Sequence, residues 1–409
     1  MRLDTVKRRE RINLLSSEAY FDNKNKISSG TEQLKLEEMV GWQINVNSPL
    51  EMKKLLYEQC KYPVQYERNI YGIEMPTANF EALLTLGKRF NDAMLMQCIK
   101  VRRIRKRLSA IEGFTVDEDG RIRTAISIAG TKTGRTSNKT SPTGKGTNLQ
   151  TVTKDDRDLF LSDIDCEFNQ NDLAGADGWT VAAHCARLGD TTMLDDYLYG
   201  IKPARVIALM VKHGPEVALW DRAKLKLMGK NINSDTDPDN NYIYFISKCC
   251  QHGSNYGMGP DLLALTIYLQ SEGEINITGA IAKVYQELYF SRYKGVREWQ
   301  EEAKHILKTK GFLQCASGQR RIFLGRKDQQ ETVNEFLSSE PQANTTYATN
   351  LALLNLWNDP ENRRNGKLIV EPLHQIHDAL CDQWHYSDRE FSRAKIKQWF
   401  NNPMIIGGI

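Results

Sequence analysis

The sequence predicts an α+β fold in which one sheet is assembled from segments that lie far apart in the chain. The first observation is a strand-like segment, "LFLSDIDCEFNQND", which ends at Asp172 just before a helical pattern begins. The second is a strand–turn–strand pattern, "GKLIVEPLHQIHDALCDQWHY", near the end of the chain. The third is the largely helical pattern of residues 190–313 between them. A single sheet that brackets this helical insertion is the most economical arrangement.

The composition is that of an ordinary globular protein. Of its 409 residues 40% are hydrophobic, enough for a sizeable core, and the net charge of +4 does not by itself indicate a polyanionic partner. No apolar run approaches the roughly 20 residues of a membrane span. The eight cysteines are scattered and we find no signal peptide, so we expect reduced thiols and a cytoplasmic location. "CCQH" at 249–252 has no second ligand pair at zinc spacing, so we expect no structural zinc.

The first part of the chain is predicted to be helical. Residues 1–45 are mostly polar and predict a helix with an irregular lead-in. Ser48 and Pro49 are typical of a helix cap and first position, and "ANFEALLTLGKRF" continues the helical pattern. In "CIKVRRIRKRLSAIEGF", apolar residues at helical spacing form one face and Lys and Arg fill the rest. This basic helix is either a solvated face or a phosphate-contacting surface.

Two hairpins and a polar loop are also expected. "DEDGRIRTAISIAG" predicts a hairpin with an Asp-Gly turn, and "GFLQCASGQRRIFLG" predicts another. Residues 131–150 contain almost no apolar side chain and predict a loop, either a linker or a segment that follows nucleic acid. "TGKGT" is not a phosphate-binding P-loop, because Gly stands where Ser or Thr must follow the Lys.

Two acidic residues stand at the ends of predicted strands. Asp172 lies at the exit of the first strand, and Asp378 lies at the turn of the late hairpin. If these strands share one sheet, the two carboxylates meet at its rim, where they repel each other. A divalent cation relieves this repulsion, and oxygen ligands favour Mg²⁺. The alternative for each isolated Asp is ordinary turn chemistry.

A second group of polar side chains follows a helical spacing. Lys248, His252 and Tyr256 are four residues apart and form one stripe on a helix. A Lys in such a stripe can hold a triphosphate, and the rings can pack on a base. The alternative is a buried aromatic face with a Lys whose ammonium group reaches the solvent.

Five segments in this order resemble the motifs of family A DNA polymerases, the DNA polymerase I type. "TGRTSN" with "TNLQTV" resembles the Gly-Arg-x-Ser-Ser…Asn-Leu-Gln segment, and "NDLAGADGWTVAAHCARLGD" resembles motif A. "KCCQHGSNYGMG" resembles motif B, "SEPQANTTYATNLALL" the Pro-x-Gln helix, and "QIHDAL" the His-Asp of motif C. The resemblance extends from about residue 45 to the end of the chain.

The resemblance implies a right-hand polymerase of the α+β class, with an antiparallel-sheet palm, mostly helical fingers and a helical thumb. The expected organisation is a lead-in at 1–45, the thumb at 46–125, the palm at 126–188 and 313–409, and the fingers at 189–312. The implied activity is template-directed extension of a primer 3′-hydroxyl with dNTPs, as a monomer that accessory replication proteins can assist. The implied cofactor is two Mg²⁺ ions, for which Mn²⁺ can substitute.

The resemblance also implies a role for individual residues. Asp172, Asp378 and the carbonyl of Leu173 would bind the metal ions. Lys248 would hold the triphosphate and protonate the leaving pyrophosphate. Asp177 would act as a steric gate against the ribose 2′-hydroxyl, and Tyr256 would stack near the templating base. His252 would lie near the sugar; the residues expected to contact DNA are Arg135, Asn148, Gln150, Arg320, Arg321, Gln342 and His377.

The chain departs from the family pattern at several positions. Ala379 replaces the acid that usually follows His-Asp, which leaves two metal carboxylates. His252 stands where Phe or Tyr is usual, and Asp177 where Glu is usual; the shorter acid predicts weaker exclusion of ribonucleotides. Tyr244 replaces an Arg that contacts the triphosphate, and a His of the fingers is also missing. The candidates to compensate are Lys202, Arg205 and Lys224.

We expect no 3′–5′ exonuclease, because only about 45 residues precede the predicted thumb. The early end after "NNPMIIGGI" resembles a phage-encoded enzyme, which would act in the host cytoplasm. Two alternatives stay open. One is a single-subunit RNA polymerase, which shares the Lys…Tyr-Gly and His-Asp motifs. The other is a catalytically weak or inactive DNA-binding subunit, suggested by Ala379 and Tyr244.

Overall fold

The computed structural model describes the chain except residues 26, 70, 71, 129, 140–145, 147, 233–237 and 409. The described chain divides into two compact units. Unit 1 contains residues Met1–Thr124, Thr140–Leu161 and Leu265–Asn276. Unit 2 contains residues Ala125–Lys139, Ser162–Ala264 and Ile277–Ile409.

Unit 1 is a group of helices around the long helix α5 (Ala93–Glu112), which packs against three others. Ser48 caps a short helix by accepting a hydrogen bond from the Glu51 amide, with Pro49 in the first turn, as predicted. Residues 1–45 contribute two helices that pack on α5. The remaining helices of unit 1 are α1 (Thr5–Ala19), α2 (Thr31–Val40), α3 (Pro49–Lys53), π-helical η1 (Lys54–Gln59), α4 (Phe80–Phe90), η2 (Leu149–Thr151) and η3 (Lys154–Leu159).

The cations of α5 are engaged within unit 1. Arg102 donates to the main-chain oxygens of Val46 (2.6 Å) and Ala78 (2.8 Å). Arg107 donates twice to Asp156, at 2.9 and 2.7 Å, and this pair helps to hold the pKa of Asp156 below its ordinary value. Arg105, which is buried, donates to Asn45, while Arg103 and Lys100 pair with Glu272 and Glu32. Most of the basic side chains of this helix therefore stabilise unit 1 itself.

One of the predicted hairpins is formed differently. An isolated bridge joins Val116 to Ile122 around the Asp-Gly turn, but β6 (Ala125–Ser127) pairs with β7 (Ser137–Lys139). The expectation of a loop throughout 131–150 was therefore wrong at β7, and residues 140–145 and 147 lie outside the described residues. The strands of unit 1 are β1 (Arg2–Leu3) with β8 (Phe160–Leu161), β2 (Tyr20–Asp22) with β3 (Ile27–Ser29), and β4 (Gln65–Arg68) with β5 (Glu74–Thr77).

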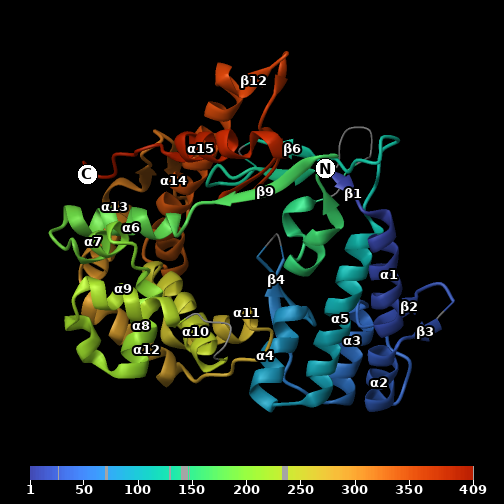
Figure 1. Ribbon diagram of the computed structural model, residues 1–409. Helices are drawn as coiled ribbons and strands as arrows, with labels where there is room; N and C mark the ends of the chain where they lie inside the picture. The colour runs from blue at the N-terminus through green and yellow to red at the C-terminus, as the bar shows by residue number, and fades with distance from the viewer. Residues whose placement is uncertain are drawn as a thin grey trace. The chain divides into compact units, whose positions relative to one another are not determined.

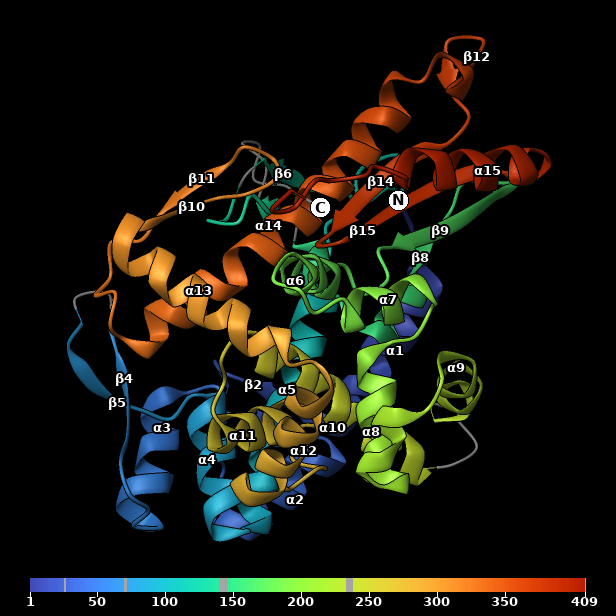
Figure 2. The same cartoon turned by 90° about the vertical axis from the view of Figure 1, so that its left-hand side faces the viewer.

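Unit 2 contains the predicted sheet of distant segments. β9 (Cys166–Asp172), β15 (Ala379–His385) and β14 (Glu371–Ile376) form a three-stranded antiparallel sheet in the order β14-β15-β9 (Figure 2). The six residues Ala379–Trp384 of the central strand β15 are buried, because α14 (Gln330–Asn358) and α15 (Arg389–Phe400) pack against it. β10 (Phe312–Gln314) and β11 (Arg320–Ile322) form the second predicted hairpin, which stays separate, as do β12 (Arg363–Arg364) and β13 (Lys367–Leu368).

The helical insertion predicted at 190–313 is confirmed. Within it α10 packs against α8 and α12, and Figure 1 shows these helices grouped together. The helices of the insertion are α7 (Thr192–Leu198), α8 (Pro203–His213), α9 (Arg222–Asn231), α10 (Pro238–Asn255), α12 (Gly279–Arg292) and α13 (Gly295–Lys310), with α11 (Pro260–Gln270) contributing to both units; α6 (Ala176–Arg187) precedes it. Short 3₁₀ turns are η4 (Pro215–Leu219), η5 (Pro360–Asn362) and η6 (Tyr386–Asp388).

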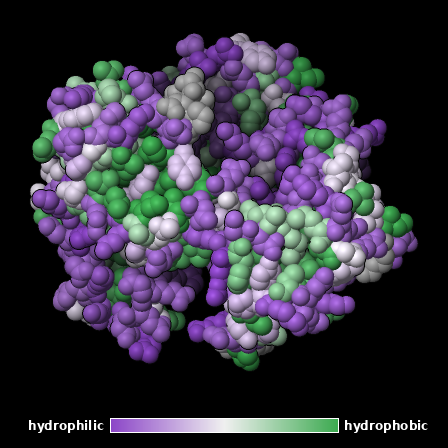
Figure 3. Space-filling model, turned by 90° about the horizontal axis from the view of Figure 1, so that it is seen from below, coloured by the Kyte–Doolittle hydropathy of each residue, from purple (hydrophilic) through white to green (hydrophobic). Residues whose placement is uncertain are grey.

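On the face shown in Figure 3, hydrophilic side chains cover most of the surface and hydrophobic ones form smaller patches between them. Among the described residues, no helix combines the length and the apolar character needed to cross a lipid bilayer.

Candidate active site

Two acidic residues from distant parts of the sequence lie at one edge of the sheet in unit 2. Asp172 is the last residue of β9 and pairs with Ala379, the first residue of β15. Asp378 directly precedes Ala379, and its main-chain oxygen accepts a hydrogen bond from the Leu173 amide at 3.3 Å. Both acids are therefore placed by the register of the same pair of strands, and a shift of this register by one residue would turn every side chain of β9 to the other face.

Asp378 is carried by a two-residue turn between β14 and β15. The first residue of this turn, His377, has φ 54°, in the left-handed region that non-glycine residues seldom adopt. A positive φ at this position is typical of the turns that match the twist of a hairpin. The turn places an exposed imidazole and a carboxylate side by side at the sheet edge. Backbone strain of this kind is concentrated at functional sites.

The electrostatics of the two acids are unfavourable without a cation. Partial burial raises the pKa of Asp172, and the negative charge of Asp378 raises it further. Lys248 and Lys202 act in the opposite direction, so both ammonium groups lie within electrostatic reach of this carboxylate. No group of three or more His, Cys, Asp or Glu side chains with metal-binding geometry occurs among the described residues. Two carboxylates and neighbouring main-chain oxygens are the hard oxygen donors that suit Mg²⁺.

The Lys248 stripe faces the solvent at one end and the protein interior at the other. Lys248 and His252 are exposed on α10, whereas Tyr256, just beyond its end, is buried. The rings of His252 and Tyr256 meet edge to face, with centroids 4.8 Å apart. Partial loss of hydration lowers the pKa of His252, and the charge of Asp177 opposes this effect. The charges of Lys248 and Arg135 add to the lowering, so the pKa stays below its ordinary value.

Asp177 is held from two sides. It lies in the first turn of α6, where a carboxylate is favourable. Tyr256 donates its hydroxyl hydrogen to Oδ2 at 2.9 Å, and Thr345 of α14 donates to Oδ1 at 2.7 Å. Each carboxylate oxygen therefore has a protein donor. Sequence reasoning missed Thr345; the only signal was a run of hydroxyl residues in the predicted helix after Gln342.

The residues expected to contact DNA are divided between the units. Asn148 and Gln150 lie in unit 1, where Asn148 caps η2 by accepting from the Gln150 amide at 3.0 Å. In unit 2, Arg321 donates to Ser339 and Glu335 of α14, so its guanidinium is occupied within the protein. Arg320 is exposed and stacks over the Phe312 ring at 3.7 Å. The other residues expected to contact DNA that lie in unit 2 are Arg135, Gln342 and His377.

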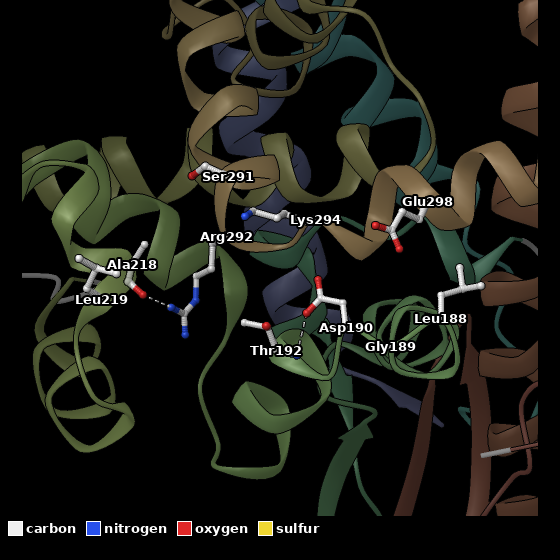
Figure 4. A pocket seen from close by; sticks show the side chains of 10 residues that line it. All are labelled: Leu188, Gly189, Asp190, Thr192, Ala218, Leu219, Ser291, Arg292, Lys294 and Glu298. Carbon is white, nitrogen blue, oxygen red and sulfur yellow. Dashed lines mark hydrogen bonds between the residues drawn. The ribbon is translucent and has the colours of Figure 1, made fainter.

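One cavity of about 570 Å³ lies in unit 2, away from these residues (Figure 4). None of the predicted site residues lines it. Arg292 at its wall donates to the Ala218 oxygen at 2.7 Å and to buried Asp196, and Asp190 accepts from the Thr192 and Gly295 amides. Arg292 and Asp190 of the cavity wall are therefore engaged within the protein.

No protein-family model matches the chain. DNA polymerase I of Lactococcus lactis subsp. cremoris is 23% identical over 395 residues, which is 92% of this chain and 39% of the relative. DNA polymerase I of Mycobacterium leprae is 22% identical over 379 residues, 88% of this chain and 37% of the relative. The chain thus spans about two fifths of the length of these relatives.

A solved structure shares the fold. The polymerase domain of Pol1 from M. smegmatis, in complex with DNA primer-template and dNTP, matches with a TM-score of 0.73 at 18% identity. The match covers 99% of this chain and 65% of that one. The predicted α+β polymerase fold and the resemblance to DNA polymerase I, limited to its polymerase domain, are therefore confirmed.

Proposed function

We propose that this chain, which has the fold of a DNA polymerase I polymerase domain, is a template-directed DNA polymerase that extends a primer 3′-hydroxyl with dNTPs. The observation that carries the proposal is the pairing of Asp172 with Ala379, which brings Asp172 and Asp378 to one edge of the sheet. Lys248 lies within electrostatic reach of the same edge. Two acids beside a free cation suit phosphoryl transfer, in which catalysis is positioning and charge stabilisation.

The residues present fit a magnesium cofactor. Asp172, Asp378 and the carbonyl of Leu173 would hold two Mg²⁺ ions, or Mn²⁺ in their place. Burial raises the pKa of Asp172 and the charge of Asp378 raises it further, and a bound cation would offset both effects. When bound, the ions supply neutralisation of charge on the attacking and leaving oxygens. His377 beside them would orient the primer terminus, and Lys248 would donate a proton to the leaving pyrophosphate.

Lys202 is the best candidate for the missing triphosphate contact. It directly precedes α8, and the Ala204 amide donates to Oε1 of Gln251 on α10 at 3.0 Å, which ties the start of α8 to the turn after Lys248. The other two candidates are less suited to this role. Nε of Arg205 is buried without a hydrogen-bond partner among the described residues, so part of its guanidinium is withdrawn from the surface, and the Lys224 ammonium lies 3.8 Å from the centre of the Trp220 ring. Tyr244, at the position of the usual Arg, packs against an apolar cluster.

We extend the proposal to the domain boundaries, the DNA contacts and proofreading. The thumb would correspond to residues 46–125, the palm to 126–188 and 313–409, and the fingers to 189–312. In unit 2 the better candidates for DNA contact are those other than Arg321, whose guanidinium is occupied: Arg135, Gln342 and exposed Arg320. In unit 1 the candidates are Asn148 and Gln150. This chain would have no 3′–5′ exonuclease, because 99% of it is matched by a polymerase domain. Degradation of a mismatched primer by the pure chain would contradict that expectation.

The test is primer extension with Mg²⁺ and either dNTPs or NTPs. We expect a DNA product that the Asp378→Ala variant does not make, while Asp328→Ala, which removes an exposed acid from the same unit, keeps full activity. An RNA product from NTPs alone would instead support a single-subunit RNA polymerase. Binding of primer-template without extension would support an inactive DNA-binding subunit.

A further inference from the structure

Two polar contacts join α6 to α14. Asp177 in the first turn of α6 accepts from Thr345, and Nε2 of His184 in its last turn lies 3.0 Å from Oε2 of Glu340. His184 stands seven positions after Asp177, which is nearly two helical turns, so both side chains lie on the same face of α6. Their partners follow in reverse order along α14. The two contacts therefore fix both the spacing and the register of an antiparallel helix pair.

The His184–Glu340 contact is buried. His184 and Glu340 are only 9% and 8% exposed, and the indole of Trp299 from α13 stacks on the imidazole with centroids 5.7 Å apart. A hydrogen bond in such surroundings is directional and little disturbed by water. Loss of one partner leaves the other buried and unpaired, which costs more than the bond itself contributes. The pair is thus a stiff connection between the two helices.

The connection is placed at the weakest point of α14. Pro341 follows Glu340 inside the helix and has no amide hydrogen to donate to the carbonyl of Leu337. A helix interrupted in this way bends most easily at that position. Thr345, which holds Asp177, lies beyond Pro341, whereas Glu340 lies before it. Anchoring Glu340 to α6 therefore limits how far Thr345 can move relative to Asp177.

We propose that His184 and Glu340 are positioning residues for Asp177, and that through it they set how strongly the enzyme selects deoxyribonucleotides over ribonucleotides. This inference rests on the proposed polymerase function. Asp177 lies beside the Lys248 stripe, since its carboxylate accepts a hydrogen bond from Tyr256 and its charge acts on His252. A displaced carboxylate would leave room for a 2′-hydroxyl.

The first test does not depend on activity. Hydrogen exchange is measured at the amides of residues 342–349 in the Glu340→Ala and Glu340→Gln variants. Gln keeps an oxygen that accepts from His184, so it is the matched control. We expect exchange to be at least tenfold faster in the Ala variant and unchanged in the Gln variant. Equal exchange in wild type and both variants would overturn the proposal whether or not the chain is a polymerase.

The second test measures the ratio of kcat/KM for a dNTP to that for the matching NTP. We expect Glu340→Ala to lower this ratio about tenfold, which corresponds to a small displacement of the gate, and Glu340→Gln to leave it unchanged. In an Asp177→Ala background Glu340→Ala should have no further effect, because both act through one group. Additive effects, or equal losses for dNTP and NTP, would show a purely structural role and overturn the proposal.

One further variant guards against misfolding. The double substitution His184→Phe with Glu340→Met replaces both partners by apolar groups of similar shape, which is close to neutral for stability and keeps a ring on Trp299. We expect a folded enzyme with the same reduced sugar selection as Glu340→Ala. Wild-type selection in this variant would overturn the proposal. A chain without any extension activity would instead refute the proposed function, and the exchange measurement would still decide the role of the pair.

Discussion

Asp172 lies directly opposite Ala379 in the β9–β15 ladder, and Ala379 is the residue that follows Asp378. The small, buried Ala379 side chain adds no charge between the two neighbouring carboxylates. Their mutual repulsion contributes to the raised pKa of Asp172. We therefore expect the edge to be destabilised in the absence of a cation and to gain stability if a divalent ion binds.

The Asp172→Asn variant tests this relationship. A folded-state pKa raised above the unfolded value means that ionisation of Asp172 disfavours the folded state as pH rises above about 4. At pH 7 in a chelator we expect the variant to have a higher Tm than wild type. Addition of Mg²⁺ should raise the Tm of wild type only, and primer extension by the variant should fall about 10³-fold or more. A lower Tm of the variant in chelator would contradict the repulsion.

Asp382 is expected to make stability pH-dependent. It is fully buried in β15, burial raises its pKa to about 7, and Asn171 donates to it at 2.6 Å. The folded state therefore holds the proton more tightly than the unfolded state. The free energy of unfolding should fall by about 4 kcal/mol between pH 4 and pH 7 and then level off, since one pKa unit corresponds to about 1.4 kcal/mol.

Urea unfolding at several pH values measures this effect. Asp382→Asn should remove most of the slope, whereas Glu390→Gln, which removes an exposed acid from α15, should leave it in place. The same slope in wild type and Asp382→Asn would assign it to other groups.

Asp177 predicts weak sugar selection. Its short side chain is held by Tyr256 and Thr345, and both oxygens are occupied. Asp177→Glu extends the carboxylate by one methylene, and we expect it to raise the preference for dNTP over NTP roughly tenfold or more. Single-turnover incorporation of dNTP and matching NTP provides the measurement. The idea fails if wild type already discriminates as strongly as the Glu variant.

Lys202 is expected to contribute to nucleotide affinity. Lys202→Ala should raise the KM for dNTP about tenfold with a smaller change in kcat, because it removes a cation near the triphosphate. Lys224→Ala is the matched control from the same helical region, and its ammonium lies over Trp220. Steady-state extension at varied dNTP concentration separates the two parameters. Equal KM values in wild type and Lys202→Ala would remove Lys202 from the site.

Much of the site could be predicted from local pattern. The strand that ends at Asp172, the turn at His377 and the helical stripe of Lys248 all follow from spacing of two or of about four residues. The cap at Ser48 was visible for the same reason. Such features depend on residues that are close in the sequence, and the spacing of residue types shows which of these share a face of a helix or strand.

Contacts between distant residues could not be predicted in this way. The basic helix α5 left two interpretations open, and only the fold brings Val46, Ala78 and Asp156 to its arginines. The Asp-Gly hairpin was misjudged because β6 found its partner in a polar segment. His184 and Glu340, which are 156 residues apart, carry no joint signal in the sequence.

By itself, the sequence determined which residues could do chemistry: two acids at strand ends, a cationic helix stripe and an acid at a helix start. The tertiary structure decided which charged side chains lie near the site and which form ion pairs elsewhere in the protein. Lys248 acts on Asp172 at the site, whereas Arg107 donates to Asp156 within unit 1. The physical reason is that propensity and periodicity act over a few residues. The partner of a buried charge is chosen by packing and desolvation, which join segments more than a hundred residues apart.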